Sequence, residues 1–278
     1  MVGRVTAGDL AATVDLLRPF WSDADLPQER FAYYEFQARR YPSIQRFLTR
    51  YAPWDGRRVL DLGGGVGGLA VVLKTRLGGA YDLAEYSVPA ERHAQALRAR
   101  GVDRSFACDL SQAHALDRLP TGYDAILLVE VLEHLLVNPL RLFRSVWDHL
   151  VPGGLFFLTT PNMARLGSRL RLLTGRSIKE SGRYPWDGSM VYGHVVEFTI
   201  DELDQLLAAE SFRRDAAEVV QQVPSVRPSR TQSAGVRLLN TRAARRLRLG
   251  DDILAAYRKV ARPPDGSCPI PLDASGRV

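Results

Sequence analysis

The sequence predicts an α/β fold, a doubly wound and mostly parallel sheet. Between residues 57 and 161, short apolar segments alternate with amphipathic segments of helical period, as a parallel sheet with both faces covered requires. The first apolar segment ends in a run of glycines, the usual turn from strand to helix at a nucleotide-binding edge. With 278 residues, 46% of them hydrophobic, the chain can bury one large core.

The individual elements follow from the same pattern. We expect strands in RRVLDL, AYDLAEY, DRSFACDL, YDAILLVE, GLFFLTTP, FRRDAAEVV and ILAAYRKV. We expect helices in GLAVVLKTR, PAERHAQALRAR, PLRLFRSVWDHL and IDELDQLLAAE. Asn138 is the expected N-cap of the third of these helices, ahead of Pro139. Thr199 and Glu202 match a capping box that opens the fourth.

The rest of the chain divides around this core. Residues 1–50 predict an N-terminal helical cap, and residues 51–262 predict the main domain. An Arg-, Gly- and Ser-rich stretch at about 163–193 breaks the alternation, and we interpret it as an insertion that forms a lid. The Pro-rich residues 263–278 predict a flexible tail.

Cysteine usage and the apolar runs indicate the compartment. The two cysteines, Cys108 and Cys268, lie far apart and match neither a disulfide framework nor a zinc pattern, which fits a reducing cytoplasm. The N-terminal residues lack the pattern of a signal peptide, and the longest apolar runs are too short to span a bilayer. We therefore expect a cytoplasmic protein without a membrane span.

The formal net charge is +6, and part of the excess is concentrated. Residues 227–250 contain seven arginines and no acid. Such a stretch can bind phosphates of a nucleic acid, a nucleotide or a lipid. Alternatively, it is a solvated face in a chain that uses Arg more than Lys. On composition alone we favour the solvated face.

The glycine run predicts a cofactor loop. Gly63, Gly65 and Gly68 satisfy the G-x-G-x-x-G spacing, and Glu85, twenty residues after Gly65, closes the next strand, where a carboxylate can accept both ribose hydroxyls of an adenosine. These residues alone would serve NAD as well as S-adenosylmethionine. Asp61, two residues before the first glycine, can order the loop and reach an amino-acid end of the cofactor through water. Asp109, at the end of the third strand, can accept from an adenine amino group.

Residues 57–162 resemble class I S-adenosylmethionine-dependent methyltransferases. The resemblance is carried by VLDLGGGVGG, the acids in AEYS and ACDL, YDAILLVE followed by VLEH, and PGGLFFLTTPN, with HVVEFTIDELDQLLAAESF as a later segment. It implies a seven-stranded Rossmann-like sheet, and the branch is the one that contains the ubiquinone-biosynthesis O-methyltransferases and many methyltransferases of glycans and natural products. The loop GGGVGG is richer in glycine than the usual family loop.

The resemblance also implies roles for individual residues, beginning with S-adenosylmethionine as the cofactor. Asp61, Gly63 and Gly65 would hold its methionine end, and Glu85 its ribose. The adenine edge would meet Asp109 and Leu110, and the reacting methyl would face Val129 and Glu130.

A metal site is the second expectation near the cofactor. Glu130, Glu133 and His134 stand at i, i+3 and i+4, which places them on one face if a helix begins there. Together with His194 they resemble the metal-binding set of the small-RNA 3′-terminal 2′-O-methyltransferases, in which E-x-x-E-H precedes a distant histidine. A divalent cation lowers the pKa of an acceptor hydroxyl, and two carboxylates with two imidazoles suit a transition metal.

The same residues also allow a metal-free interpretation. Glutamates are favoured in a first helical turn, and Glu-His is common at this place in the broad branch. Without a metal, His134 or His194 becomes the candidate general base, with Glu130 beside it.

The leading hypothesis is therefore methylation of a hydroxyl on a small molecule or glycan. A second hypothesis is 2′-O-methylation of RNA or a nucleotide. The metal set and the basic stretch favour it, whereas the sequence shows no separate RNA-binding module. A third is a non-catalytic cofactor-binding module, against which the glycine loop and its acids argue. An NAD oxidoreductase is the most distant alternative. The acceptor and the oligomeric state do not follow from the sequence.

Overall fold

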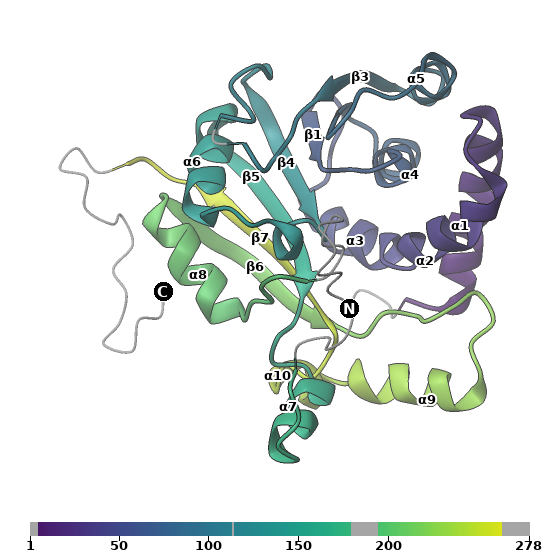
Figure 1. The fold of residues 1–278 in the computed structure, drawn as a ribbon, viewed down its shortest axis with the longest axis vertical. Coiled ribbons are helices and arrows are strands. Elements are labelled where there is room, and N and C mark those ends of the chain that lie inside the picture. The colour runs from purple at the N-terminus through teal and green to yellow at the C-terminus, as the bar shows by residue number, and fades with distance from the viewer. Residues whose placement is uncertain (1–4, 113, 179–193, 263–278) are drawn as a thin grey trace, which may run out of the picture.

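The computed structural model describes residues 5–112, 114–178 and 194–262 (Figure 1). In chain order these residues form α1 (Ala7–Asp23), η1 (Gln28–Arg30), α2 (Phe31–Ala38), α3 (Tyr41–Leu48), η2 (Thr49–Tyr51), β1 (Arg58–Leu62), α4 (Gly68–Leu77), β2 (Ala80–Glu85), α5 (Glu91–Arg98), β3 (Val102–Ala107), β4 (Tyr123–Val129), η3 (Leu132–His134), α6 (Pro139–His149), β5 (Leu150–Pro161), α7 (Leu166–Leu173), α8 (Ile200–Ala209), β6 (Phe212–Val220), α9 (Arg230–Leu239), α10 (Arg242–Arg246) and β7 (Asp252–Lys259).

The strands form a seven-stranded sheet in the order β3-β2-β1-β4-β5-β7-β6. β7 runs antiparallel to both of its neighbours, β5 and β6, and the other pairs are parallel. The predicted fold, a doubly wound and mostly parallel seven-stranded sheet, is confirmed. The chain order reverses between β1 and β4, so a crevice opens at the carboxyl ends of these strands, where ligands bind in sheets of this kind.

Side chains of the central strands alternate between two cores. Ala125 and Leu127 of β4 belong to the core that α1, α3 and α4 cover, and Ile126 and Leu128 belong to the core that α6 and α8 cover. Period-two alternation of buried apolar residues on both faces is why this strand is apolar throughout its length. Figure 1 shows the two groups of helices on opposite sides of the sheet.

The local signals at helix starts are confirmed. The Asn138 side chain accepts from the Leu140 amide at the start of α6, and Thr199 and Glu202 form the complete capping box of α8. The Arg-rich residues 227–250 contain two helices that the sequence pattern did not predict, α9 and α10. None of the helices in the described ranges combines the length and the hydrophobicity that crossing a bilayer requires.

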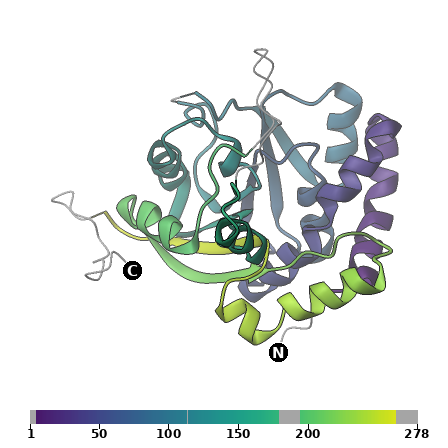
Figure 2. The same cartoon turned by 60° about the horizontal axis from the view of Figure 1, so that its bottom comes forward.

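Of the N-terminal helices, α1 packs against α4 and α5, α3 packs against α4, and α2 packs against α1 and α3 (Figure 2). Of the expected lid insertion, residues 163–178 are described and contain α7, and residues 179–193 lie outside the described ranges. The expected tail, residues 263–278, also lies outside them. Closure of a lid stays a prediction.

Candidate functional site

A cavity of about 410 Å³ lies at the carboxyl ends of β1, β2 and β4. One wall is the glycine loop with Asp61 and Glu85, and the end of β4 contributes Val129. The N-terminal helices supply the opposite wall, with Tyr33, Tyr34 and Gln37 of α2. The cavity therefore lies at the topological switch point, between the sheet and the helical cap.

The glycine loop needs its glycines at two positions for different reasons. Gly63 has a φ of 72°, and a Cβ there would lie 2.7 Å from a methyl group of Val131. Gly65 has a φ of 57°, and a Cβ there would meet nothing within 4 Å. Gly63 is thus required by packing as well as by backbone geometry, whereas Gly65 leaves open space beside the loop for a bound molecule.

Asp61 lies beneath this loop and is fully buried. Burial, and after it the nearby charge of Glu85, raise the pKa of its carboxyl group to about 7, and the Ala70 amide opposes this shift. Neither carboxylate oxygen has a hydrogen bond of acceptable geometry. A buried carboxylate without a partner, at the edge of a cavity, fits a site that binds a cationic group.

Glu85 closes β2 and already supports the loop. Its Oε2 accepts from the Gly65 amide at 2.7 Å, and its Oε1 accepts from the Tyr86 amide at 2.8 Å. His93 of α5 adds a second support, because its Nε2 lies 2.9 Å from the Val66 carbonyl oxygen. No motif in the sequence marks His93, and only its position in three dimensions brings it to the loop.

The adenine-side residues lie apart from this cavity. Asp109 follows β3, and its carboxylate accepts from the hydroxyl and amide of Ser111 and from Gln112. The Ser111 hydroxyl is the main cause that lowers the pKa of Asp109. Leu110 is buried beside a neighbouring cavity. Of the seven residues expected to bind the cofactor, these two do not line the cavity, and Asp61, Gly63, Gly65, Glu85 and Val129 do.

Glu130, directly after β4, has a left-handed backbone with a φ of 54°. Its Oε1 accepts from the Thr159 hydroxyl at 2.8 Å, and its Oε2 lies 3.0 Å from Nε of Arg40, a residue between α2 and α3. Such a backbone is strained for a residue with a side chain and is found at functional sites. Arg40 was missed in the sequence, because no local pattern marks a partner 90 residues away.

The expected helix at Glu130–His134 is wrong. Residues Leu132–His134 form a single 3-10 turn, and the left-handed Glu130 stands before it. The spacing i, i+3, i+4 therefore does not place the three side chains on one helix face, and Glu130 is directed toward the cavity and Arg40 instead.

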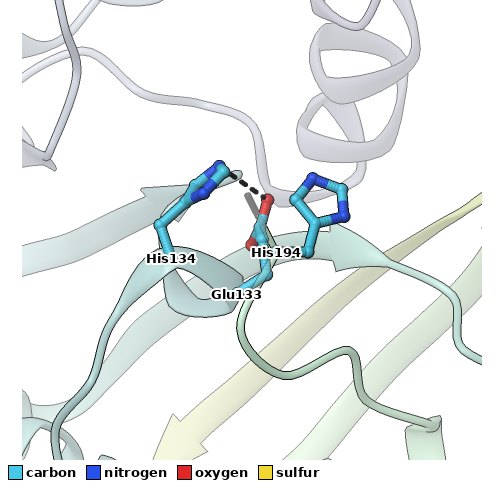
Figure 3. Close-up of side chains that lie close together, drawn as sticks. All are labelled: Glu133, His134 and His194. Atoms are coloured by element: carbon cyan, nitrogen blue, oxygen red, sulfur yellow. Dashed lines mark ion pairs between the residues drawn. The ribbon is translucent and has the colours of Figure 1, made fainter. Parts of the chain in front are cut away.

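The other three residues of the expected metal set converge (Figure 3). Glu133, His134 and His194 each offer one ligand atom, and these atoms lie within 4.8 Å of one another. The two imidazole rings stand 5.2 Å apart between centroids, and Nε2 of His134 lies 3.8 Å from Oε1 of Glu133. Glu130 is not part of this group.

The Glu133 side chain is fully buried, and burial disfavours the charged form of a carboxyl group. Burial is the main cause that raises its pKa, followed by the charge of Glu130. Its Oε2 accepts from the Thr160 hydroxyl, while its Oε1 has no hydrogen-bond partner. A buried carboxylate oxygen without a hydrogen bond, beside two imidazoles, is a donor set that fits a divalent transition metal.

Glu197 orients His194. Its Oε1 lies 2.9 Å from Nδ1 of His194, and its other oxygen forms an ion pair with Arg165. Despite burial, hydrogen bonds from His194 and Arg165 lower its pKa. A carboxylate behind a histidine fixes the orientation of the ring. The spacing of three residues after His194 was the available signal in the sequence.

The fold, the glycine loop and the buried acids define the class of protein as one that binds an adenosine-containing cofactor at a doubly wound sheet. A family described as a methyltransferase domain matches residues 36–214. The chain therefore belongs to the class I S-adenosylmethionine-dependent methyltransferases, and S-adenosylmethionine is its cofactor. None of the curated proteins resembles the chain in sequence at a significant level.

Solved structures share the fold at low sequence identity. A methyltransferase from Mesorhizobium loti aligns with a TM-score of 0.51 and 20% identity, over 80% of this chain and 98% of its own. One from Archaeoglobus fulgidus aligns with a TM-score of 0.53 and 18% identity, over 84% and 100% of the two chains. A complex of the Haloferax volcanii Trm112 methyltransferase activator with a methyltransferase aligns with a TM-score of 0.55 and 15% identity, over 90% and 99%.

Proposed function

We propose that the protein transfers the methyl group of S-adenosylmethionine to a hydroxyl oxygen of a small molecule or glycan. The observation that carries this proposal is the convergence of Glu133, His134 and His194 within 4.8 Å, next to the Glu130 that lines the cofactor cavity. Hydroxyl acceptors are poor nucleophiles until they lose a proton, and this cluster offers the chemistry that removes one.

The residues of the cavity would bind and orient the cofactor. The buried Asp61 would face the cationic amino-acid end, and Glu85 would accept from the ribose hydroxyls. The cofactor supplies an electrophilic methyl on a sulfonium, and the protein contributes by positioning. Asp109 and Leu110 stay proposed contacts of the adenine edge, which would require the cofactor to extend beyond the present cavity.

Glu133, His134 and His194 would hold a divalent metal ion, with Glu130 held apart by Arg40. When bound, such an ion lowers the pKa of the acceptor hydroxyl. Without it, His134 or His194 is the candidate general base. Glu197 lies at Nδ1 of His194 and would support the protonated form of that ring.

The second candidate acceptor is the 2′-hydroxyl of RNA or a nucleotide. The same three residues favour it, because they are three of the four that resemble the metal-binding set of the small-RNA enzymes. The third candidate is a non-catalytic module that only binds the cofactor. It would not explain why Glu133, His134 and His194 converge.

Methyl transfer distinguishes these alternatives directly. The protein is incubated with S-adenosylmethionine labelled in its methyl group and with separate panels of phenols, glycans, nucleotides and short RNAs. Product mass identifies the acceptor class, and a chelator followed by Mn²⁺, Co²⁺ or Zn²⁺ shows whether a metal is needed. A label that appears on nitrogen or carbon, or on no acceptor while the cofactor binds, contradicts O-methylation.

A further inference from the structure

A surface rich in exposed leucine and arginine occupies one end of the molecule. It consists of residues 166–178 and 227–249, which include α7, α9 and α10, and we call it the Leu/Arg surface. Figure 1 shows these helices together at the bottom of the view, and Figure 2 turns this end forward. The Arg169 guanidinium donates to the Leu247 carbonyl oxygen at 2.8 Å. The Leu166 amide donates to the Leu249 carbonyl oxygen at 3.0 Å. These hydrogen bonds join α7 to the turn after α10.

Five leucines of this surface face solvent, each between 54% and 83% exposed. They are Leu170, Leu172 and Leu173 of α7, Leu238 of α9 and Leu247 after α10. Isolated exposed leucines are common on soluble proteins, but a group on adjoining helices marks a place where apolar surface is removed from water by a partner.

The charge of this region has one sign. Residues 166–178 and 227–249 together contain ten arginines and no acid. Among the described residues, Glu218 forms an ion pair with Arg245, and Asp201 forms one with Arg248. The other eight are exposed: Arg169, Arg171, Arg176, Arg227, Arg230, Arg237, Arg242 and Arg246. Their charge is complementary to a surface of phosphates.

The composition decides which phosphate-bearing partner fits. Neither segment contains an aromatic residue, whereas proteins that bind single-stranded nucleic acid stack bases on aromatic side chains. Leucines interspersed with arginines are what helices lying at a membrane surface present, with the leucines below the headgroups and the guanidinium groups among them.

We propose that the Leu/Arg surface docks the protein on an anionic lipid bilayer. The inference concerns a surface outside the cofactor cavity and does not depend on the acceptor or on a metal. Docking uses both kinds of side chain, because the arginines supply attraction to anionic headgroups and the leucines supply burial in the acyl boundary.

Flotation of the full chain with vesicles tests this proposal. One vesicle type contains phosphatidylcholine alone and the other contains phosphatidylcholine with phosphatidylglycerol. We expect the protein to float with the anionic vesicles, less so as salt rises, and to stay behind with the neutral ones. The double variant Leu172→Glu/Leu173→Glu should lose roughly tenfold or more of the binding, and so should Arg237→Glu/Arg246→Glu.

Matched controls alter exposed residues elsewhere. Leu136→Glu and Arg118→Glu make the same kinds of substitution, one at a time, outside the surface, and these variants should bind vesicles as the unaltered protein does. Binding of S-adenosylhomocysteine, measured for every variant, reports whether the fold is kept. Equal flotation with both vesicle types, no flotation, or unchanged flotation of the Leu172→Glu/Leu173→Glu variant overturns the proposal. Preference for single-stranded RNA over anionic vesicles, insensitive to the leucine changes, overturns it in favour of nucleic acid.

Discussion

Arg40 and Glu130 meet between the N-terminal helices and the sheet, with Nε of Arg40 3.0 Å from Oε2 of Glu130. Both side chains are nearly buried, at 10% and 9% exposure. Asp252 of β7 lies 3.8 Å from the same Nε, so one guanidinium stands between two buried acids. This arrangement fastens the helical cap to the strand end that lines the cofactor cavity.

Removing Arg40 should therefore destabilise the fold. Arg40→Gln leaves Glu130 and Asp252 without their cation, and breaking a buried ion pair from one side costs about 3–5 kcal/mol. Urea denaturation measures the loss. The matched control is Arg98→Gln. The exposed ion pair between Arg98 and Glu91 should contribute less than about 1 kcal/mol to the free energy of unfolding. The double variant Arg40→Gln/Glu130→Gln should recover part of the loss, and additive losses would mean that the two residues do not interact.

The fold was predictable because its signals are local. The apolar strand YDAILLVE, the glycine turn after β1 and the caps at Asn138 and Thr199 act through neighbours in the sequence. The seven-stranded Rossmann-like sheet followed from the family resemblance, and the structure has it.

The errors arose where tertiary contacts decide. A helix beginning at Glu130 was reasonable from spacing, yet Thr159 and Arg40 hold this residue in a left-handed backbone. No periodicity in the sequence reports partners that are 29 and 90 residues away. Helices α9 and α10 were not expected in residues 227–250, where α9 has no buried side chain and α10 buries only Ala244.

Asp61 should make stability depend on pH. Burial raises its folded pKa from 3.8 to about 7, so the acid form favours folding, and this contribution is lost as pH rises from about 4 through about 7. Between pH 5 and pH 8, the free energy of unfolding of the cofactor-free protein should fall by roughly 2–3 kcal/mol more than that of the Asp61→Asn variant.

Denaturation of both proteins at the two pH values measures this difference. Asp103→Asn, at an exposed acid, is the control and should follow the unaltered protein. Saturating S-adenosylhomocysteine should reduce the difference, since its ammonium group favours the ionised Asp61. Identical pH slopes for the unaltered protein and Asp61→Asn would show that Asp61 is not the buried acid that the structure describes.

Glu85 should act on both the ribose and the loop. Glu85→Ala removes the acceptor of the Gly65 amide and the charged acceptor of the ribose, which should weaken binding of S-adenosylhomocysteine by on the order of 1–3 kcal/mol. Glu85→Gln keeps an oxygen for Gly65 and loses only the charge, so its loss should be smaller. Calorimetry measures both, and NAD should bind to neither the unaltered protein nor the variants. Binding of NAD in place of S-adenosylhomocysteine would reject this site.

Helix α2 should become protected when the cofactor product binds. Tyr33, Tyr34 and Gln37 line the cavity, so a ligand adds contacts to this helix. Hydrogen exchange with and without S-adenosylhomocysteine measures the amides of α2. Helix α6, on the other side of the sheet, is the internal control and should not change. Equal exchange in α2 with and without ligand would show that the cap does not respond to the cofactor.

His194 should control metal binding without affecting the cofactor. His194→Ala removes one of three converging donors, while Asp61 and Glu85 contact the cofactor elsewhere. Titration with Mn²⁺, Co²⁺ or Zn²⁺ should show the affinity of the unaltered protein lost in the variant, with binding of S-adenosylhomocysteine nearly unchanged. His114→Ala, at an exposed histidine, is the matched control and should bind metal normally.

Glu197→Gln separates a metal site from a general base. Glu197 accepts from Nδ1 of His194, and loss of such an outer carboxylate lowers metal affinity about 10–100-fold. If a metal is used, excess metal should restore the activity of this variant, because the three donors are intact. If His194 acts as a base instead, chelators should have no effect, and the variant should stay slow at any metal concentration because the ring has lost the carboxylate that supports its protonated form. Activity that is unaltered by the substitution and by chelation would remove His194 from both roles.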